Sequence, residues 1–408
     1  MESQRKPEIN MYDYQKLTAE SAPPVIVMPE GLAADVKYVF SVTYTDPDAM
    51  ELEGLSKVAS NVILNEGKNL AGYPPAQGDE GLREYIAEEL KIKRSADINK
   101  NNIFLSSGAG GACQVFVDAF IDAGDYVIMD EFCYHGSLNM FMRKGAIPVH
   151  VKMDEHGIIP SEVESIVKKM ISNGNKPKLI YTISVYHNPT GVTLSFDRRR
   201  DLIEVSKKYG IPIVENESYA DFRIDGPQLP PAMIGMDRDG GVMYISAFTK
   251  LMGCGLRLGF GVFPEQARQP LANMNFGVSP SNLVSLIIHE YLKSNKASYV
   301  ENVSASLKSK RDSMLQSLGE YFPPSCSWTE PDGGMMIWVE LPEGCDTWST
   351  LDKAVGKGVK YNPGPIFRGD REFRNHLRLT YSHNSPDEIR EGMAILAEVF
   401  EKEGFFNG

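Results

Sequence analysis

A lysine and an arginine lie between two short apolar runs in residues 242–262. The runs, Val242–Ile245 and Leu258–Val262, are typical of buried strands. Lys250 follows the first run, and Arg257 comes seven residues later. A desolvated lysine amine loses its proton more easily and then attacks aldehydes, and the donor fork of arginine suits a phosphate. Lys250 and Arg257 at this spacing could therefore hold an aldehyde that carries a phosphate. Taken by itself, however, the spacing is more often that of an exposed lysine in a turn, because most lysines are exposed.

The elements that must position these residues form a regular pattern from residue 103 onward. Apolar strands are predicted at 103–107, 126–129, 147–151, 179–184, 211–214, 242–246 and 258–262, with helices between most of them. Apolar strands that alternate with helices indicate a parallel sheet covered on both faces. The fold class is therefore α/β, with three layers around a mostly parallel sheet.

The remaining segments flank this sheet. Residues 1–50 are weakly periodic and are expected to form an arm or lid and part of a small domain. Residues 51–298 are expected to form the large domain, and residues 299–408 a small α+β domain with strands near 333–340 and 377–381. A chain of 408 residues is too long for one ordinary core, which agrees with two domains.

Composition excludes several classes of protein. The hydrophobic content of 42% and charged content of 24% are those of a globular protein, and the net charge of −12 argues against nucleic acid or an anionic membrane as partner. The five cysteines show no Cys-x-x-Cys spacing, so neither a disulfide framework nor a metal site is indicated. No signal peptide or membrane span is apparent, and we expect a cytoplasmic protein.

Polar and aromatic residues follow most of the predicted strands, where ligands of open α/β sheets bind. The turn Gly108-Ala109-Gly110 opens a helix and could offer backbone N–H groups to a phosphate. It could also be a dinucleotide-binding turn, with Asp130 placed to bind a ribose, but Cys113 occupies the position of the third glycine. A plain strand–helix turn is a third possibility.

Together these motifs resemble the fold-type I pyridoxal-phosphate enzymes, in the class I/II aminotransferase family, over about residues 50–400. The resemblance rests on the loop around Tyr73, the turn at 107–112, Tyr134, Asn188-Pro189-Thr190-Gly191, Tyr219, Lys250, Arg257, Gly333-Gly334-Met335, Pro363-Gly364 and Arg378. Their common order and spacing make the match specific. It implies an enzyme whose cofactor is pyridoxal 5′-phosphate.

The resemblance also implies a role for each matched residue. Lys250 would form the Schiff base and act as general base. The phosphate would be bound by Gly108, Ala109, Gly110, Ser246, Thr249, Arg257 and, from the neighbouring subunit of a homodimer, Tyr73. Tyr134 would stack on the pyridine ring, while Asn188 and the catalytic Tyr219 would bond its 3-hydroxyl. Arg378, with Asn188 and Thr45, would bind the carboxylate of an amino-acid substrate.

Three positions depart from the family pattern. Asn216 replaces the aspartate that keeps the pyridine nitrogen protonated, and an amide cannot form that ion pair. Glu215 and Glu217 flank it but should point to the opposite face of a strand, unless the register differs by one residue. Ala247 replaces a serine, and Thr45 stands where a glycine is common.

The departures leave the reaction type open. An aminotransferase is the expected activity. A weaker electron sink at Asn216 would instead favour elimination, replacement or cyclisation of an amino-acid side chain in specialised metabolism. A third possibility is a binding or regulatory module that keeps the fold without catalysis, although Lys250, Asn188, Arg257 and Arg378 argue against it. The sequence does not identify the substrate.

Overall fold

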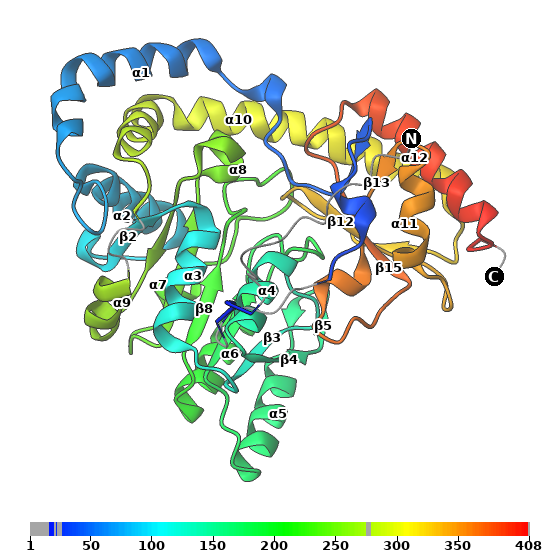
Figure 1. Ribbon diagram of the computed structural model, residues 1–408, viewed down its shortest axis with the longest axis horizontal. Helices are drawn as coiled ribbons and strands as arrows, with labels where there is room; N and C mark the ends of the chain where they lie inside the picture. Colours follow the sequence, from blue (N-terminus) through cyan, green and yellow to red (C-terminus); the bar gives the residue numbers. More distant parts are fainter. Residues whose placement is uncertain (1–15, 20–21, 23–26, 275–278, 407–408) are drawn as a thin grey trace, which may run out of the picture.

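A computed structural model describes residues 16–19, 22, 27–274 and 279–406 (Figure 1). Its centre is a seven-stranded sheet with the order β2-β10-β9-β8-β7-β3-β4. The strands are β2 (Ile103–Ser106), β3 (Tyr126–Asp130), β4 (Ile147–Val151), β7 (Leu179–Ile183), β8 (Ile213–Asn216), β9 (Val242–Ala247) and β10 (Gly259–Val262). β10 runs antiparallel to both of its neighbours, and the other pairs are parallel.

Helices cover both faces of this sheet, which explains why most of its strand residues are apolar. On one face α3 (Gly108–Phe120), α4 (His135–Arg143) and α9 (Arg268–Met274) pack against side chains such as Phe104 and Ile245. On the other face α5 (Pro160–Ser172), α6 (Phe196–Tyr209) and α7 (Met233–Met236) pack against side chains such as Ile180. A short hairpin, β5 (Met153–Asp154) and β6 (Gly157–Ile158), precedes α5. The predicted three-layer fold class is confirmed.

The small domain is built on a second, antiparallel sheet with the order β11-β12-β15-β14. Its strands are β11 (Ser327–Trp328), β12 (Met336–Glu340), β14 (Asn362–Pro363) and β15 (His376–Thr380), and its helices are α11 (Thr347–Val355) and α12 (Pro386–Lys402). The early strand β1 (Tyr38–Val39) pairs with β13 (Val359–Lys360), so this part of the first fifty residues lies against the small domain.

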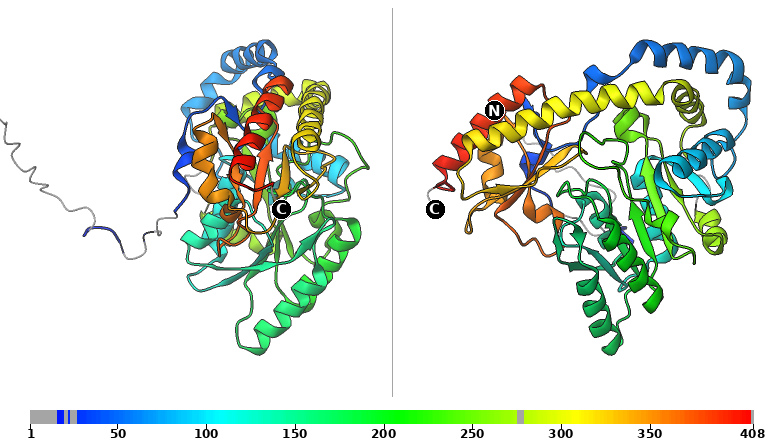
Figure 2. Two further views of the ribbon diagram at one scale, coloured as in Figure 1. Left: turned by 90° about the vertical axis from the view of Figure 1, so that its right-hand side faces the viewer. Right: turned by 180° about the vertical axis from the view of Figure 1, so that it is seen from behind.

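Three helices complete the large domain and join it to the small one. These are α1 (Leu52–Glu66), α2 (Glu80–Arg94) and the 40-residue α10 (Asn282–Tyr321). Figure 2 shows α10, in yellow, crossing from the large domain to α12 of the small domain. The predicted boundary between residues 298 and 299 therefore falls inside one continuous helix. Among the described residues, no helix is long and apolar enough to cross a membrane.

Candidate active site

The short helix α8 (Thr249–Met252) carries Lys250 directly after β9. The lysine Nζ donates a hydrogen bond to the carbonyl oxygen of Thr43 at 2.8 Å, and the sulfur of Cys254 lies 3.7 Å away. The hydroxyl of Thr45 donates to the carbonyl of Lys250 at 3.0 Å. The extended chain at 43–45 therefore fixes both the amine and the backbone of Lys250.

The loop after β7 supplies Asn188, and the turn after β8 supplies Tyr219. The Asn188 amide nitrogen donates to the Tyr219 hydroxyl at 3.3 Å, and the Thr43 hydroxyl lies 3.3 Å from the same oxygen. Because neighbouring parallel strands end at one edge of the sheet, residues from β7, β8 and β9 meet here. These contacts join Tyr219 to Thr43, whose carbonyl binds the lysine amine.

Arg378 of β15 brings a cation from the small domain into this group. Its guanidinium donates to Asn188 Oδ1 at 2.7 Å and to the carbonyl of Ser41, and Nε has no hydrogen-bond partner among the described atoms. Burial lowers its pKa to about 10. Among the described residues no carboxylate forms an ion pair with it, and its side chain is 2% exposed. A buried cation without an anion is costly, so this site is suited to an anionic ligand.

The turn after β2 forms a cradle with Thr249 and Arg257. Gly108 begins α3 with a φ of +71°, and a Cβ there would lie 3.0 Å from Thr249 Oγ1 and 3.3 Å from Arg257 Nη2. The helix N-terminus, with Ala109 and Gly110 in its first turn, leaves backbone N–H groups free for an anion. Arg257 is exposed and lies at a φ of +51°, an uncommon conformation outside glycine. These donors fit a phosphate.

Tyr134 lies directly before α4, and the missing side chain of Gly136 leaves room for its ring. A Cβ on Gly136 would lie 2.6 Å from the ring. Burial and the neighbouring Tyr219 raise the pKa of Tyr134, whereas Lys250, Arg378 and Arg257 act to lower it. Tyr134 therefore shares an electrostatic environment with the residues described above.

Asn216 is the last residue of β8 and is buried. Its amide nitrogen donates to the Tyr181 hydroxyl at 2.9 Å, and its oxygen accepts from the Ser218 backbone N–H at 3.1 Å and hydroxyl at 2.6 Å. Tyr181 in turn lies 2.8 Å from the Ser137 hydroxyl. Among the described residues, no carboxylate forms a hydrogen bond with Asn216.

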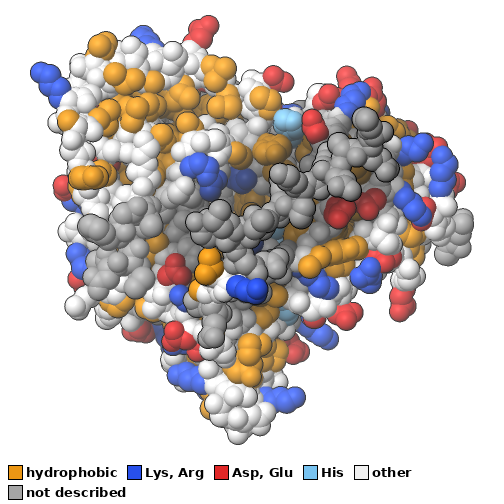
Figure 3. Space-filling model, viewed as in Figure 1, with side chains coloured by type: hydrophobic (Ala, Val, Ile, Leu, Met, Phe, Trp, Pro, Cys, Tyr) orange, Lys and Arg blue, Asp and Glu red, His pale blue; other side chains and the backbone are white. Residues whose placement is uncertain are grey.

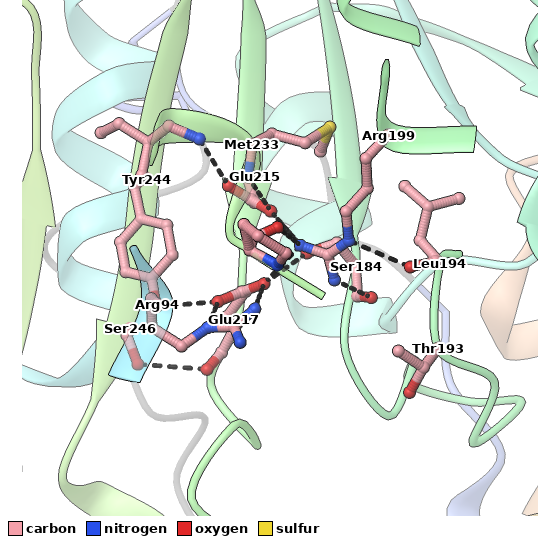
Figure 4. Close-up of polar contacts among 12 residues, drawn as sticks. Arg94, Ser184, Thr193, Leu194, Arg199, Glu215, Glu217, Met233, Tyr244 and Ser246 are labelled. Carbon is pink, nitrogen blue, oxygen red and sulfur yellow. Dashed lines mark hydrogen bonds and ion pairs between the residues drawn. The ribbon is translucent and has the colours of Figure 1, made fainter. Parts of the chain in front are cut away.

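The two flanking glutamates belong to a separate buried cluster (Figure 4). Glu217 binds Arg94 through two hydrogen bonds of 2.7 Å, and both Glu215 and Glu217 accept from Arg199. Ser184 donates to both glutamates as well. Burial opposes ionisation of Glu217, but Arg94 and Arg199 outweigh it and lower its pKa. The glutamates thus point to the face of β8 opposite to Asn216, as predicted from strand alternation.

Of three further predicted site residues, Ser246 and Tyr73 lie apart from the group around Lys250, whereas Thr45 lies beside it. The Ser246 hydroxyl donates to the carbonyl of Glu217 at 3.1 Å, beside the glutamate cluster. The Thr45 hydroxyl is used by the backbone of Thr249 and Lys250. Tyr73 is fully exposed in the loop before α2.

Other residues of the site were not predicted. Thr43 contacts Lys250 through a backbone carbonyl, which any residue type could provide. His135 lies beside Tyr134, with ring centroids 4.8 Å apart, and burial lowers its pKa to about 3, assisted by Arg378 and Arg371. The signal for His135 was its position directly after Tyr134.

Comparisons with known proteins agree with this geometry. The family model described as aminotransferase class I and II matches residues 43–396. The chain is 30% identical over 360 residues to aromatic-amino-acid aminotransferase 1 of Thermococcus litoralis, covering 88% of this chain and 86% of the relative. The structure of a multiple substrate aminotransferase from Thermococcus profundus matches with a TM-score of 0.90 and 26% identity, over 96% of this chain and 99% of that one.

A second solved structure, an archaeal alanine:glyoxylate aminotransferase, matches with a TM-score of 0.89 and 29% identity over 96% of this chain and the whole of that chain. The family model spans most of the large domain and most of the small domain. The dinucleotide-binding alternative for the turn at Gly108 is therefore set aside. The chain belongs to the class I and II aminotransferases, which are enzymes that use pyridoxal phosphate.

Proposed function

We propose that this enzyme transfers the amino group of an α-amino acid, with pyridoxal phosphate held covalently by Lys250. The observation that carries the proposal is the buried guanidinium of Arg378, which has no acidic partner among the described residues and hydrogen-bonds Asn188. An α-carboxylate would supply the missing anion, and a guanidinium binds a carboxylate in a fixed bidentate geometry.

The residues present fit the cofactor at both of its ends. Gly108, Thr249 and Arg257 surround a space that a single Cβ would fill, and their donors suit the phosphate. Asn188 and Tyr219 would hold the ring oxygen, and Tyr134 would lie against the ring. Ser246 is the weakest member of the predicted set because its hydroxyl already donates to Glu217.

When bound, pyridoxal phosphate supplies an aldehyde carbon and a ring that draws electrons from the substrate Cα. Arg378 fixes the carboxylate and thereby sets which bond at Cα stands perpendicular to the ring. Lys250 would hold the cofactor through its aldehyde carbon, and its Nζ would act as the general base for the Cα proton. The Thr43 carbonyl, which accepts from Nζ at 2.8 Å, keeps the amine nearby to return that proton.

The substrate class proposed here is α-amino acids, without a particular side chain. The relatives are named for aromatic amino acids, for alanine with glyoxylate and for multiple substrates. The amino acids in these names share an α-carboxylate and an α-amino group, and their side chains differ.

We further propose a homodimer in which Tyr73 of each subunit reaches the phosphate of the other. Tyr73 is fully exposed, and Leu52, Ile63 and Leu64 of α1 expose 63%, 51% and 79% of their surfaces. In Figure 3, hydrophobic side chains gather across the upper left of the molecule, where Figure 1 places α1. An apolar surface of this kind is typical of a subunit interface.

The five free cysteines favour the reducing cytoplasm.

Elimination, replacement or cyclisation of a substrate side chain is the second candidate function. The observation that favours it is Asn216, whose amide carries no charge and which no carboxylate contacts among the described residues. A ring that draws electrons less strongly leaves more negative charge at Cα, from which a leaving group on the side chain can depart.

The covalent assignment is tested by borohydride reduction of the loaded enzyme and mass mapping of its peptides. We expect one cofactor equivalent on the peptide that contains Lys250, and we expect Lys250→Ala to lose both the adduct and turnover. Lys176→Ala, at an exposed lysine, is the control and should keep both. An adduct on a different lysine, or turnover by Lys250→Ala, would contradict the proposal.

A further inference from the structure

The amide of Asn216 has a fixed orientation in this structure. A backbone N–H can only donate, so the amide atom 3.1 Å from the Ser218 nitrogen must be the oxygen. The Ser218 hydroxyl, 2.6 Å away, occupies the second acceptor position of that oxygen. The amide nitrogen therefore lies on the side of Tyr181, and a flipped amide would set two donors against each other.

The hydrogen-bonding capacity left on Asn216 is that of a donor. Both lone pairs of its oxygen are used by Ser218. Its nitrogen carries two hydrogens, and one of them binds the Tyr181 hydroxyl at 2.9 Å. A group that binds Asn216 must consequently offer a lone pair rather than an N–H.

The nearby carboxylates are held by other partners. Glu215 accepts from Arg199, Ser184 and the backbone nitrogens of Met233 and Ile234. Glu217 accepts from Arg94, Arg199, Ser184 and Tyr244. Asp130 accepts from the Thr182 hydroxyl and the Ile183 N–H, and it lies 3.1 Å from His187 Nε2. Turning any of these side chains toward Asn216 would break several buried hydrogen bonds and leave their donors without acceptors.

We propose that Asn216 holds the pyridine nitrogen of the bound cofactor in its neutral form by donating a hydrogen bond to its lone pair. This inference rests on the proposed function, because it takes Lys250 as the attachment point and the end of β8 as the location of the ring nitrogen. A neutral ring nitrogen accepts electrons from Cα less readily than a protonated one. The chain thus carries the groups of an aminotransferase around a weakened electron sink.

The test is the ring-nitrogen NMR shift of enzyme loaded with ¹⁵N-labelled pyridoxal phosphate, measured between pH 6 and 9. Free cofactor, recorded above and below its own ring pKa, supplies the two reference shifts. We expect the wild-type signal at the neutral reference throughout. Asn216→Asp should move it to the protonated reference, because the new carboxylate can pair with N–H⁺, still accepts from Ser218, and can accept from the Tyr181 hydroxyl once that hydroxyl turns.

Two control variants test whether the Asn216 amide itself sets the protonation state of the ring nitrogen. Tyr181→Phe removes one partner of Asn216 but leaves the Ser218 contacts that orient the amide, so the neutral signal should persist. Asn173→Asp makes the same charge change at an exposed position and should also leave it unchanged. A protonated signal in the wild type, or in Tyr181→Phe, would overturn the inference.

The outcome is separable from failure of the proposed function. If borohydride reduction places no cofactor on Lys250, the proposed function fails before the NMR shift is interpreted. If the cofactor is on Lys250 and its ring nitrogen is protonated in the wild type, only the role of Asn216 is wrong. Should Asn216→Asp not fold, the wild-type shift alone still decides between the two protonation states.

Discussion

His135 is a titratable residue beside the proposed carboxylate site. Its ring lies between Tyr134 and Phe367, and its Nδ1 has no hydrogen-bond partner among the described atoms. Burial, together with the charges of Arg378 and Arg371, lowers its pKa to about 3. The imidazole is therefore neutral at physiological pH, which keeps a second positive charge away from Arg378.

This pKa predicts a pH dependence of stability. Unfolded His135 binds a proton below about pH 6.5, whereas folded His135 does so only near pH 3. Its contribution to the unfolding free energy is complete above pH 6.5 and is lost as the pH falls toward 3, by up to about 1.4 kcal/mol per pH unit. Urea unfolding of the cofactor-free protein between pH 4 and 7 should show a shallower slope for His135→Phe than for the wild type.

The exposed His156 supplies the control for this comparison. His156→Phe removes an exposed imidazole and leaves His135 in place. The dependence of the unfolding free energy on pH should therefore remain that of the wild type. Equal slopes in the wild type and His135→Phe would show that the fold does not hold His135 neutral.

The family resemblance, carried by motifs of specific order and spacing, singled out residues that the structure brings close together. Lys250, Asn188, Tyr219 and Arg378 were singled out from the sequence and lie together in the structure through the contacts of Tyr219, Asn188 and Thr43. The Thr43 carbonyl could not be predicted, because backbone contacts carry no signature of residue type. The Ser246 hydroxyl contacts Glu217 because of the face of β9 on which it lies. Predicting that face requires the exact register of the strand.

At the scale of elements, the turn between β2 and α3 carries the proposed phosphate site. The sequence predicted that Gly108-Ala109-Gly110 opens a helix, and α3 begins at Gly108, so these glycines lie in the first turn of the helix itself. Glycine has the lowest helix propensity apart from proline, so propensity alone does not indicate a helix that begins with glycines. This start places the free N–H groups beside Thr249 and Arg257.

Gly108→Ala should weaken cofactor binding because its Cβ would enter the space between Thr249 and Arg257. Loss of one charged hydrogen bond is worth about 1.5–3 kcal/mol, so the Kd of pyridoxal phosphate should rise about 10-fold to 100-fold. Titration of the cofactor-free enzyme, followed by absorbance, measures this Kd.

Gly124→Ala is a matched control for backbone strain. Gly124 has a φ of +92°, and a Cβ there would meet nothing within 4 Å. Both variants pay a cost of about 1–2 kcal/mol for a non-glycine residue at positive φ, but Gly124→Ala should bind the cofactor normally. Equal Kd values for the two variants would contradict the assignment of the cradle.

Strand order and direction were predictable only in part. The run 258–262 was assigned to a mostly parallel sheet, and β10 is its antiparallel member. An apolar run shows that a strand is buried but not which way it runs. The connection from β9 to β10 is too short for a parallel crossover, so its length was the available clue.

At the scale of the whole molecule, α10 determines how the two domains are joined. It packs against α1 in the large domain and α12 in the small one, and it is continuous through residue 298. The length of the chain led to the prediction of two domains. The boundary was harder to predict because a helix shared by both domains contains no turn or linker residues at the crossing point.

The proposed dimer predicts the behaviour of α1 in solution. Leu64→Glu would place a charge on an apolar surface that the partner should cover. A symmetric dimer would bury two copies of Leu64, and each buried leucine contributes about 1.5–3 kcal/mol. Sedimentation velocity should show a dimer for the wild type and a dimer Kd raised at least about 100-fold for Leu64→Glu.

Ile92→Glu offers a control at a leucine-sized side chain of similar exposure. Ile92 lies on α2 and is 67% exposed, against 79% for Leu64. The Ile92→Glu variant should remain a dimer. A monomeric wild type, or equal dissociation of both variants, would remove α1 as the interface.

Transamination is tested most directly by a single half-reaction in the absence of a keto-acid acceptor. The loaded enzyme is mixed with one amino acid at a time, and the released product and the cofactor are identified by mass spectrometry. For an aminotransferase we expect one equivalent of keto acid per site and conversion of the cofactor to its amine form. Release of a cleaved, dehydrated or cyclised amino acid, with the cofactor recovered as the aldehyde, would contradict transamination as the reaction of this enzyme.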